Sequence, residues 1–103
     1  MHSIQIEDLE ISADDPWKKA WVKKYGTSVY TSPSFVYYSQ GIEPIKEWEA
    51  LTPYRLQRLD LVIMSIDHWG QLKPIKVCGN IIQTGHKRAA AMAYLGYKEI
   101  KCE

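Results

Sequence analysis

The sequence predicts an α/β (α+β) fold, in which helices pack on a small mixed sheet. Residues 14–26 and 52–70 each carry a helix start signal, a helical spacing of apolar residues and a closing glycine. Beyond residue 70 the pattern changes to the alternation typical of strands, interrupted by a tight turn and then by an alanine-rich helix. The order helix, hairpin, helix and strand is typical of a domain that mixes helices with a few strands.

The composition indicates a single soluble domain. The chain has 103 residues, of which 46% are hydrophobic and 24% charged. No apolar run has the roughly 18–20 residues of a membrane span, and residues 1–10 lack the basic and apolar regions of a secretory signal. We therefore expect a cytoplasmic protein with no membrane partner, in which Cys78 and Cys102 are reduced thiols.

The charge is unevenly distributed, although the net charge is only +1. Residues 1–16 contain acids but no Lys or Arg, whereas residues 17–40 contain four lysines and no acid. Residues 41–69 are net acidic, and residues 70–103 carry six Lys or Arg against two acids. The two basic regions are the candidate surfaces for an anionic partner.

The first helix is expected over residues 14–26. Asp14 or Asp15 can cap it, Pro16 suits its first position and Gly26 suits its end.

This helix separates aromatic from basic side chains. Trp17, Trp21 and Tyr25 recur every four residues and share one face. The lysines lie elsewhere on the helix: Lys18, Lys19, Lys23 and Lys24. An aromatic stripe with interleaved lysines can bind nucleic acid or a membrane surface, but a core-facing stripe beside a solvated charged face is more common. We expect the aromatic face to join the core and keep the four lysines as candidates for nucleic-acid binding.

The segment that follows is rich in Ser, Thr and Tyr. Val29–Tyr30 and Phe35–Tyr38 are predicted as short strands, separated by a loop at the Ser32-Pro33 pair. Its tyrosines are expected to cover the core.

The second helix, residues 52–70, has the clearest signals. Thr52 suits the N-cap, Pro53 the first helical position and Gly70 the end. Its expected core-facing side chains are Leu56, Leu59, Val62, Ile63, Ile66 and Trp69.

The rest of the chain predicts a hairpin, a helix and a strand. Pro74–Cys78 and Ile81–Gln83 alternate around Gly79-Asn80, which is a tight-turn pair. An alanine-rich helix follows, and residues 97–103 alternate as a last strand.

The start of the alanine-rich helix is the candidate site. A helix N-terminus has unpaired N–H donors and a partial positive charge, so it favours an anion. Gly85 lacks a Cβ and allows close approach, and His86, Lys87 and Arg88 add side-chain donors. Basic residues in a first turn oppose the helix dipole. Either a bound phosphate or carboxylates from elsewhere in the chain would explain them.

Several short motifs run through the C-terminal half in a set order. They are Ser65-Ile66 with Gly70, Lys73-Pro74-Ile75-Lys76-Val77, Gly85-His86-Lys87-Arg88, Ala89-Ala90-Ala91 and Leu95-Gly96-Tyr97. Their order and spacing, over about residues 56–103, resemble the ParB/sulfiredoxin-like domain superfamily, which includes ParB-like nucleases and free-serine kinases. The chain length predicts a single domain over residues 1–103. Within it, the resemblance implies that residues 42–103 have this sulfiredoxin-like fold, and residues 1–41 remain unassigned apart from one helix.

The resemblance also implies a function and its residues. It implies a bacterial or phage protein that binds a nucleotide such as ATP or CTP, with Mg²⁺, at a phosphate turn. Gly85 matches the glycine of that turn and Arg88 its phosphate-binding arginine. His86 and Lys87 are the donors between them, and Thr84 precedes them.

The turn departs from its relatives where they carry out chemistry. Two members of the superfamily have another residue at the position of His86: sulfiredoxin has a cysteine there, and the CTP-binding partition proteins have a glutamate. The free-serine kinases have an acid at the position of Thr84. The catalytic residues are therefore unknown, and a working carboxylate must come from elsewhere. Glu43, Glu47 and Glu49 are the nearest candidates.

Three functions follow as hypotheses. The first is nucleotide binding at the Gly85–Arg88 helix start, with phosphotransfer or hydrolysis left open. The second is DNA binding or cleavage by a ParB-like nuclease, although no acid cluster for a metal is evident. The third is a catalytically inactive module that contacts a protein partner through the aromatic N-terminal half.

Overall fold

The computed structural model describes residues 2–48 and 52–103, and it confirms the α+β class. The helices and strands are, in chain order, β1 (His2–Gln5), η1 (Ile6–Asp8), α1 (Pro16–Tyr25), η2 (Val29–Thr31), α2 (Pro33–Gln40), η3 (Glu43–Trp48), α3 (Pro53–Trp69), β2 (Lys76–Cys78), β3 (Ile81–Thr84), α4 (His86–Tyr94) and β4 (Glu99–Cys102). The elements labelled η are short 3₁₀ helices.

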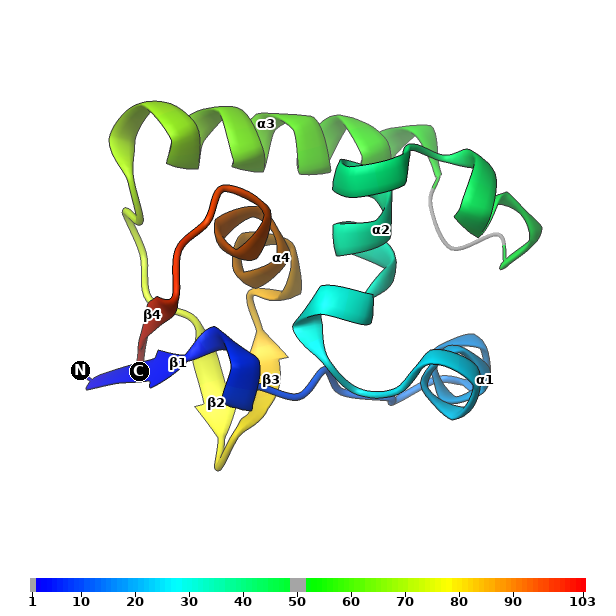
Figure 1. Cartoon of the computed structure of the whole chain (residues 1–103), viewed down its shortest axis with the longest axis horizontal. Helices are drawn as coiled ribbons and strands as arrows, with labels where there is room; N and C mark the ends of the chain where they lie inside the picture. Colours follow the sequence, from blue (N-terminus) through cyan, green and yellow to red (C-terminus); the bar gives the residue numbers. More distant parts are fainter. Residues whose placement is uncertain (1, 49–51) are drawn as a thin grey trace.

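The elements form layers, with α4 at the centre. In Figure 1, α3 lies along one side, α2 and α4 lie beneath it, and the strands and α1 lie on the far side of α4 and α2. The strands form two antiparallel pairs, β1 with β4 and β2 with β3. Single parallel bridges join Ile75 to Cys102 and Glu10 to Ile81.

The two helices with the clearest signals begin and end as predicted. The Asp15 side chain accepts a hydrogen bond from the Lys18 N–H at the start of α1. The Thr52 side chain accepts one from the Arg55 N–H at the start of α3. Gly70 ends α3 with a φ of 76°, a conformation that glycine adopts without strain.

The strands predicted at Val29–Tyr30 and Phe35–Tyr38 are wrong, because this segment is helical. Val29–Thr31 forms η2, and α2 then begins at Pro33. The Ser32 side chain accepts a hydrogen bond from the Phe35 N–H, so the Ser-Pro pair is a helix cap followed by a first-turn proline.

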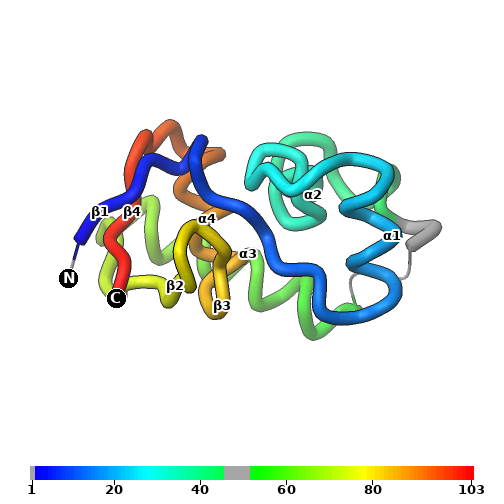
Figure 2. The backbone as a smooth tube through the Cα atoms, turned by 90° about the horizontal axis from the view of Figure 1, so that it is seen from below, coloured from blue at the N-terminus to red at the C-terminus, as the bar shows by residue number. Residues whose placement is uncertain are grey.

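Residues 2–12, for which the sequence predicted no element, join the fold along the strands. β1 pairs with β4 over four residues, and the Ile6 N–H donates to the Lys98 carbonyl at 2.8 Å. Further along, the Glu10 N–H donates to the Asn80 carbonyl and the Glu10 carbonyl accepts from the Ile82 N–H. Figure 2 shows this segment running past the β2–β3 hairpin before it reaches α1.

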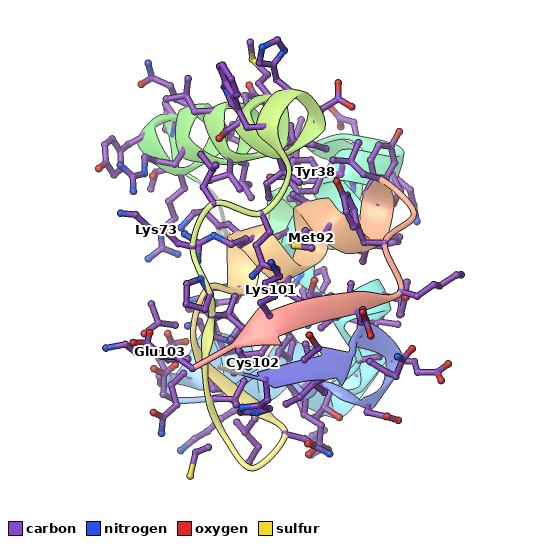
Figure 3. The ribbon with its side chains drawn as sticks, turned by 90° about the vertical axis from the view of Figure 1, so that its left-hand side faces the viewer. Tyr38, Lys73, Met92, Lys101, Cys102 and Glu103 are labelled. Carbon is purple, nitrogen blue, oxygen red and sulfur yellow. The ribbon has the colours of Figure 1, made fainter. Side chains whose placement is uncertain are left out.

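The core draws on both halves of the chain. Its buried side chains include Ile6, Leu9, Trp21, Val29, Ile66, Ile75, Ile82, Ala89, Met92 and Ile100. Figure 3 shows this layering from the side, with Met92 on α4 and Cys102 on β4 labelled. Cys78 and Cys102 are both free thiols.

The aromatic stripe of α1 only partly faces this core. Trp21 is 2% exposed and its indole N–H donates to the Thr31 carbonyl. Tyr25 is 40% exposed, and Trp17 is half-buried. On α3, Trp69 also departs from the expected core face, because it is 68% exposed and its ring lies against His68. Residues at helix ends extend beyond the layer that they were expected to pack against.

The tyrosines of α2 cover the core, as expected. The Tyr38 hydroxyl donates to the Leu59 carbonyl at 2.6 Å, and the Tyr37 hydroxyl donates to the Asp60 carboxylate at 3.0 Å. These bonds tie α2 to α3. Across residues 2–48 and 52–103, no helix is long and apolar enough to cross a membrane.

Candidate functional site

The candidate site begins where β3 passes into α4. Thr84 is the exposed last residue of β3, and Gly85 follows it with a φ of 110°. A Cβ built on Gly85 would overlap the Ile75 side chain and lie 2.8 Å from its Cβ. The structure therefore gives this glycine a packing role, because Ile75 fills the space that a Cβ would occupy. Its predicted role in binding a phosphate stays a prediction.

The first turn of α4 has no side-chain cap. Within the described ranges, no hydrogen bond is formed by the backbone N–H groups of His86, Lys87 and Arg88. Such N–H groups carry the partial positive charge of a helix N-terminus and can bind an anion. This feature agrees with the sequence-based prediction.

His86 is a bonded, neutral residue and not a free cation. Its Nε2 lies 3.2 Å from the Ser12 N–H and 3.1 Å from the Ser12 hydroxyl oxygen. Because a backbone N–H can only donate, Nε2 is the acceptor and the ring proton is assigned to Nδ1. Burial and, to a smaller extent, the positive charges of Lys18 and Lys87 lower the pKa of His86 to about 4, against the opposing effect of the Asp14 carboxylate. His86 thus anchors the N-terminal segment to the start of α4.

Lys87 lies on one side of the α4 start, in a pocket of about 190 Å³ that we call the Lys87 pocket. Its lining is Ile11, Ser12, Trp17, Lys18, Trp21, Ser32, Pro33, Ser34, Arg55, His86 and Lys87. Burial lowers the pKa of Lys87, and the positive charges of Arg55, Arg58 and Lys18 lower it further.

Arg88 lies on another side, in a pocket of about 260 Å³ that we call the Arg88 pocket. Its lining is Arg58, Leu61, Val62, Ser65, Ile66, Gly70, Leu72, Lys73 and Arg88. Figure 3 shows Lys73 on the segment between α3 and β2, at the edge of the molecule. Two adjacent residues of one predicted phosphate turn thus contribute to two separate hollows.

The structure also separates the other predicted residues. Of the four lysines of α1, only Lys18 lines a pocket, and Lys19, Lys23 and Lys24 are exposed on the helix surface. Glu43 is exposed and lines neither pocket. The side chain of Glu47 and the whole of Glu49 lie outside the described residues.

Sequence reasoning missed several polar residues that line the pockets, including Ser12, Ser34, Arg55, Arg58, Ser65 and Lys73. One signal was available for Arg55. Like Lys87, it is a basic residue in the first turn of a helix, where the dipole disfavours it. No local pattern could identify Ser12 or Lys73, because only the tertiary fold brings them to α4.

Neither pocket is built to hold a metal ion. No carboxylate of a described side chain lines either pocket, and carboxylate oxygens are the side-chain ligands that Mg²⁺ prefers. In the part of the chain that the structure describes, no three His, Cys, Asp or Glu side chains form a group that could hold a metal ion. Side chains of this site therefore do not fit Mg²⁺ on their own, and the ion would have to arrive with a ligand's phosphates.

No protein-family model, no curated protein and no solved structure matches this chain. The similarity to ParB/sulfiredoxin-like domains accordingly stays a resemblance of short motifs.

Proposed function

We propose that this protein binds a nucleotide, with the phosphates held in the Arg88 pocket beside the start of α4. One observation carries the proposal: the cations Arg58, Lys73 and Arg88 come from three separate segments and line one hollow, and no acidic side chain among residues 2–48 and 52–103 is described as lining it. In the described structure, no carboxylate pairs with Lys73 or Arg88. Three cations gathered in this way are suited to a polyphosphate.

The rest of the pocket fits the other parts of a nucleotide. The Ser65 hydroxyl adds a polar group that can bond a phosphate or a ribose oxygen. Leu61, Val62 and Leu72 form an apolar wall, and Leu61 and Leu72 are more than half exposed. Binding a base against this wall would remove apolar surface from water.

The proposed activity is binding. A general base for hydrolysis or phosphotransfer must lie within hydrogen-bond reach of the attacking group, and among the described side chains no carboxylate lines this pocket. Mg²⁺ would enter with the nucleotide and neutralise part of its charge. Arg58, Lys73 and Arg88 would bind and orient the phosphates.

Calorimetry tests the proposal with ATP, ADP and CTP, each titrated with Mg²⁺ into the full chain. At least one nucleotide should release or absorb heat, and Arg88→Ala should weaken its binding by about tenfold or more, because a charge-assisted hydrogen bond is lost. The matched control is Lys76→Ala, which removes an exposed β2 lysine outside both pockets. Absence of heat with all three nucleotides, or equal losses in both variants, would refute the proposal.

A second candidate function is DNA binding. It is favoured by the exposure of Lys19, Lys23 and Lys24 on α1, away from both pockets. Phosphate contacts made by these lysines would retard DNA in a gel, and the retardation would fall steeply with salt. Lys19→Ala/Lys23→Ala should abolish that retardation and leave nucleotide binding unchanged.

The third hypothesis, a protein partner on the aromatic N-terminal half, has less surface to use than the sequence suggested. Tyr30, Phe35, Tyr37 and Tyr38 pack against the core. The most exposed large apolar residues lie on and after α3 instead: Tyr54, Met64, Trp69 and Leu72. A partner that binds through apolar contacts would be expected there.

A further inference from the structure

The Lys87 pocket lies where all four α-helices begin. Its lining takes Trp17 and Lys18 from the first turn of α1, and Pro33 and Ser34 from that of α2. It takes Arg55 from the first turn of α3. The first turn of α4 supplies His86 and Lys87. The positive ends of four helices therefore contribute to one small hollow.

The charges in these first turns have the sign opposite to the usual preference. Acidic residues stabilise the start of a helix, yet none of the four first turns contains one. Three of them contain Lys or Arg instead, and Lys18, Arg55 and Lys87 all line the pocket. In three separate helices, a basic residue thus occupies a first-turn position that the helix dipole disfavours, and all three basic side chains line the same pocket.

Among the described residues, the charges of Lys18 and Lys87 are offset only in part. Lys18 forms an ion pair with Asp14 at 3.1 Å, but the Asp14 carboxylate lies at the surface with a side chain 71% exposed. Lys87 forms no ion pair within the described ranges. The charges that lower its pKa are those of the cations Arg55, Arg58 and Lys18. An anion in the pocket would relieve this repulsion.

The walls of the pocket restrict what can enter. Trp17, Trp21 and Pro33 provide an apolar side, and the Ser34 hydroxyl makes no hydrogen bond in the described structure. The volume of about 190 Å³ is below the roughly 300–1,000 Å³ of pockets that hold drug-sized ligands. A phosphate group with a small apolar or aromatic substituent fits this space and chemistry.

We propose that the Lys87 pocket is a second binding site, for a small phosphate ester whose phosphate contacts Lys18, Arg55 and Lys87 and whose organic part lies against Trp17. The site is independent of the nucleotide pocket, because Arg88, Arg58 and Lys73 are not needed for it. A protein with both sites would hold a nucleotide and a small phosphorylated compound on opposite sides of one helix start.

Binding can be measured by titrating the full chain with phenyl phosphate, inorganic phosphate and phenol, by calorimetry and by the change in tryptophan fluorescence. Phenyl phosphate should bind most tightly, inorganic phosphate more weakly, and phenol weakest of the three. Trp17→Phe should remove most of the fluorescence change. Phenol binding as tightly as phenyl phosphate, or no binding of either phosphate at millimolar concentration, would overturn the proposal.

Variants separate this site from the nucleotide pocket. Lys87→Met should weaken phenyl phosphate binding by about tenfold or more, and Ser34→Ala by a few-fold, because each loses a donor to the phosphate. Lys23→Met is the matched control, since that lysine is exposed on α1 outside the pocket. Arg88→Ala should leave phenyl phosphate binding unchanged, whatever it does to nucleotides.

The opposite pattern would contradict the second site. Loss of phenyl phosphate binding in Arg88→Ala, with Lys87→Met and Ser34→Ala unaffected, would assign the phosphate to the Arg88 pocket. Circular dichroism on each variant checks that the fold is kept. Ser34→Ala removes a single hydroxyl group from the lining of the Lys87 pocket. It therefore tests the proposal even if Lys87→Met alters packing.

Discussion

The Lys87 pocket and the Arg88 pocket resemble each other in charge and differ in construction. Counting only the side chains that the structure describes, each is lined by three Lys or Arg residues and by no carboxylate. The Arg88 pocket has aliphatic walls from α3 and the segment after it, whereas the Lys87 pocket has tryptophan walls and several hydroxyls. Adjacent residues on a helix point about 100° apart, so a two-residue motif can serve two different sites. The comparison shows that a basic helix start is not by itself one binding site.

The largest expected effect comes from replacing Gly85, which lies directly before the α4 turn whose side chains line both pockets. Gly85→Ala places a Cβ against Ile75 and forces alanine to a φ of 110°, so it should destabilise the fold by about 3 kcal/mol or more. Gly79→Ala is the control, because its φ of 62° is also positive but nothing lies within 4 Å of the added Cβ. It should cost only about 1 kcal/mol. Urea unfolding measures both, and equal losses would contradict the packing role of Gly85.

The next effect is a pH dependence of the free energy of unfolding, caused by His86, which lines the Lys87 pocket and not the Arg88 pocket. The fold holds His86 neutral down to a pKa of about 4, whereas an unfolded histidine takes up its proton near pH 6.5. Between these pH values the unfolded chain therefore binds more protons than the folded chain. The stability that the neutral His86 contributes is fully present above pH 6.5 and is lost as the pH falls toward 4. The loss should amount to about 3 kcal/mol.

Two His86 variants check the source of that loss. His86→Gln keeps an acceptor for the Ser12 N–H and removes the titration, so the pH dependence between 6.5 and 4 should flatten with stability largely kept. His86→Ala leaves the Ser12 N–H without this acceptor and should be less stable at neutral pH by about 1–3 kcal/mol. An unchanged pH profile in His86→Gln would assign the dependence to other groups.

The smallest expected effect is the change in stability when one positive charge is removed from the Lys87 pocket. Lys87→Met removes a cation that faces Arg55 and Lys18, so the ligand-free protein should gain a few tenths of a kcal/mol, limited by solvent screening. Thermal unfolding at low and high salt measures this gain, which should shrink as salt is added. A loss of stability at low salt would mean that the Lys87 stem contributes more by packing than its charge costs.

Much of the fold could be predicted because its signals are local. Asp15, Thr52 and the glycines that end α1 and α3 act within one helical turn, and the pair Gly79-Asn80 joins strands that are neighbours in sequence. The pairing of β1 with β4 joins His2 to Cys102, so no local pattern could identify it.

The site shows the same limit. The basic turn at residues 86–88 is visible in the sequence because its sign opposes the helix dipole. The division of that turn between two pockets depends on Ser12, Arg55 and Lys73, which tertiary packing brings to α4. The Ser-Pro pair at residue 32 was ambiguous because it suits both a loop and a helix cap.

The pairing of β1 with β4 also sets an order of events in folding. These strands close a loop nearly as long as the chain, and the entropy lost in closing a loop grows with its length. The β2–β3 hairpin and the helices need only nearby residues, so they can form before this closure. The first and last strands are therefore expected to join late, and the register of residues 2–5 is set only when they do. The hydrogen bonds between Glu10 and the β2–β3 hairpin can position Ser12 against His86 before that closure.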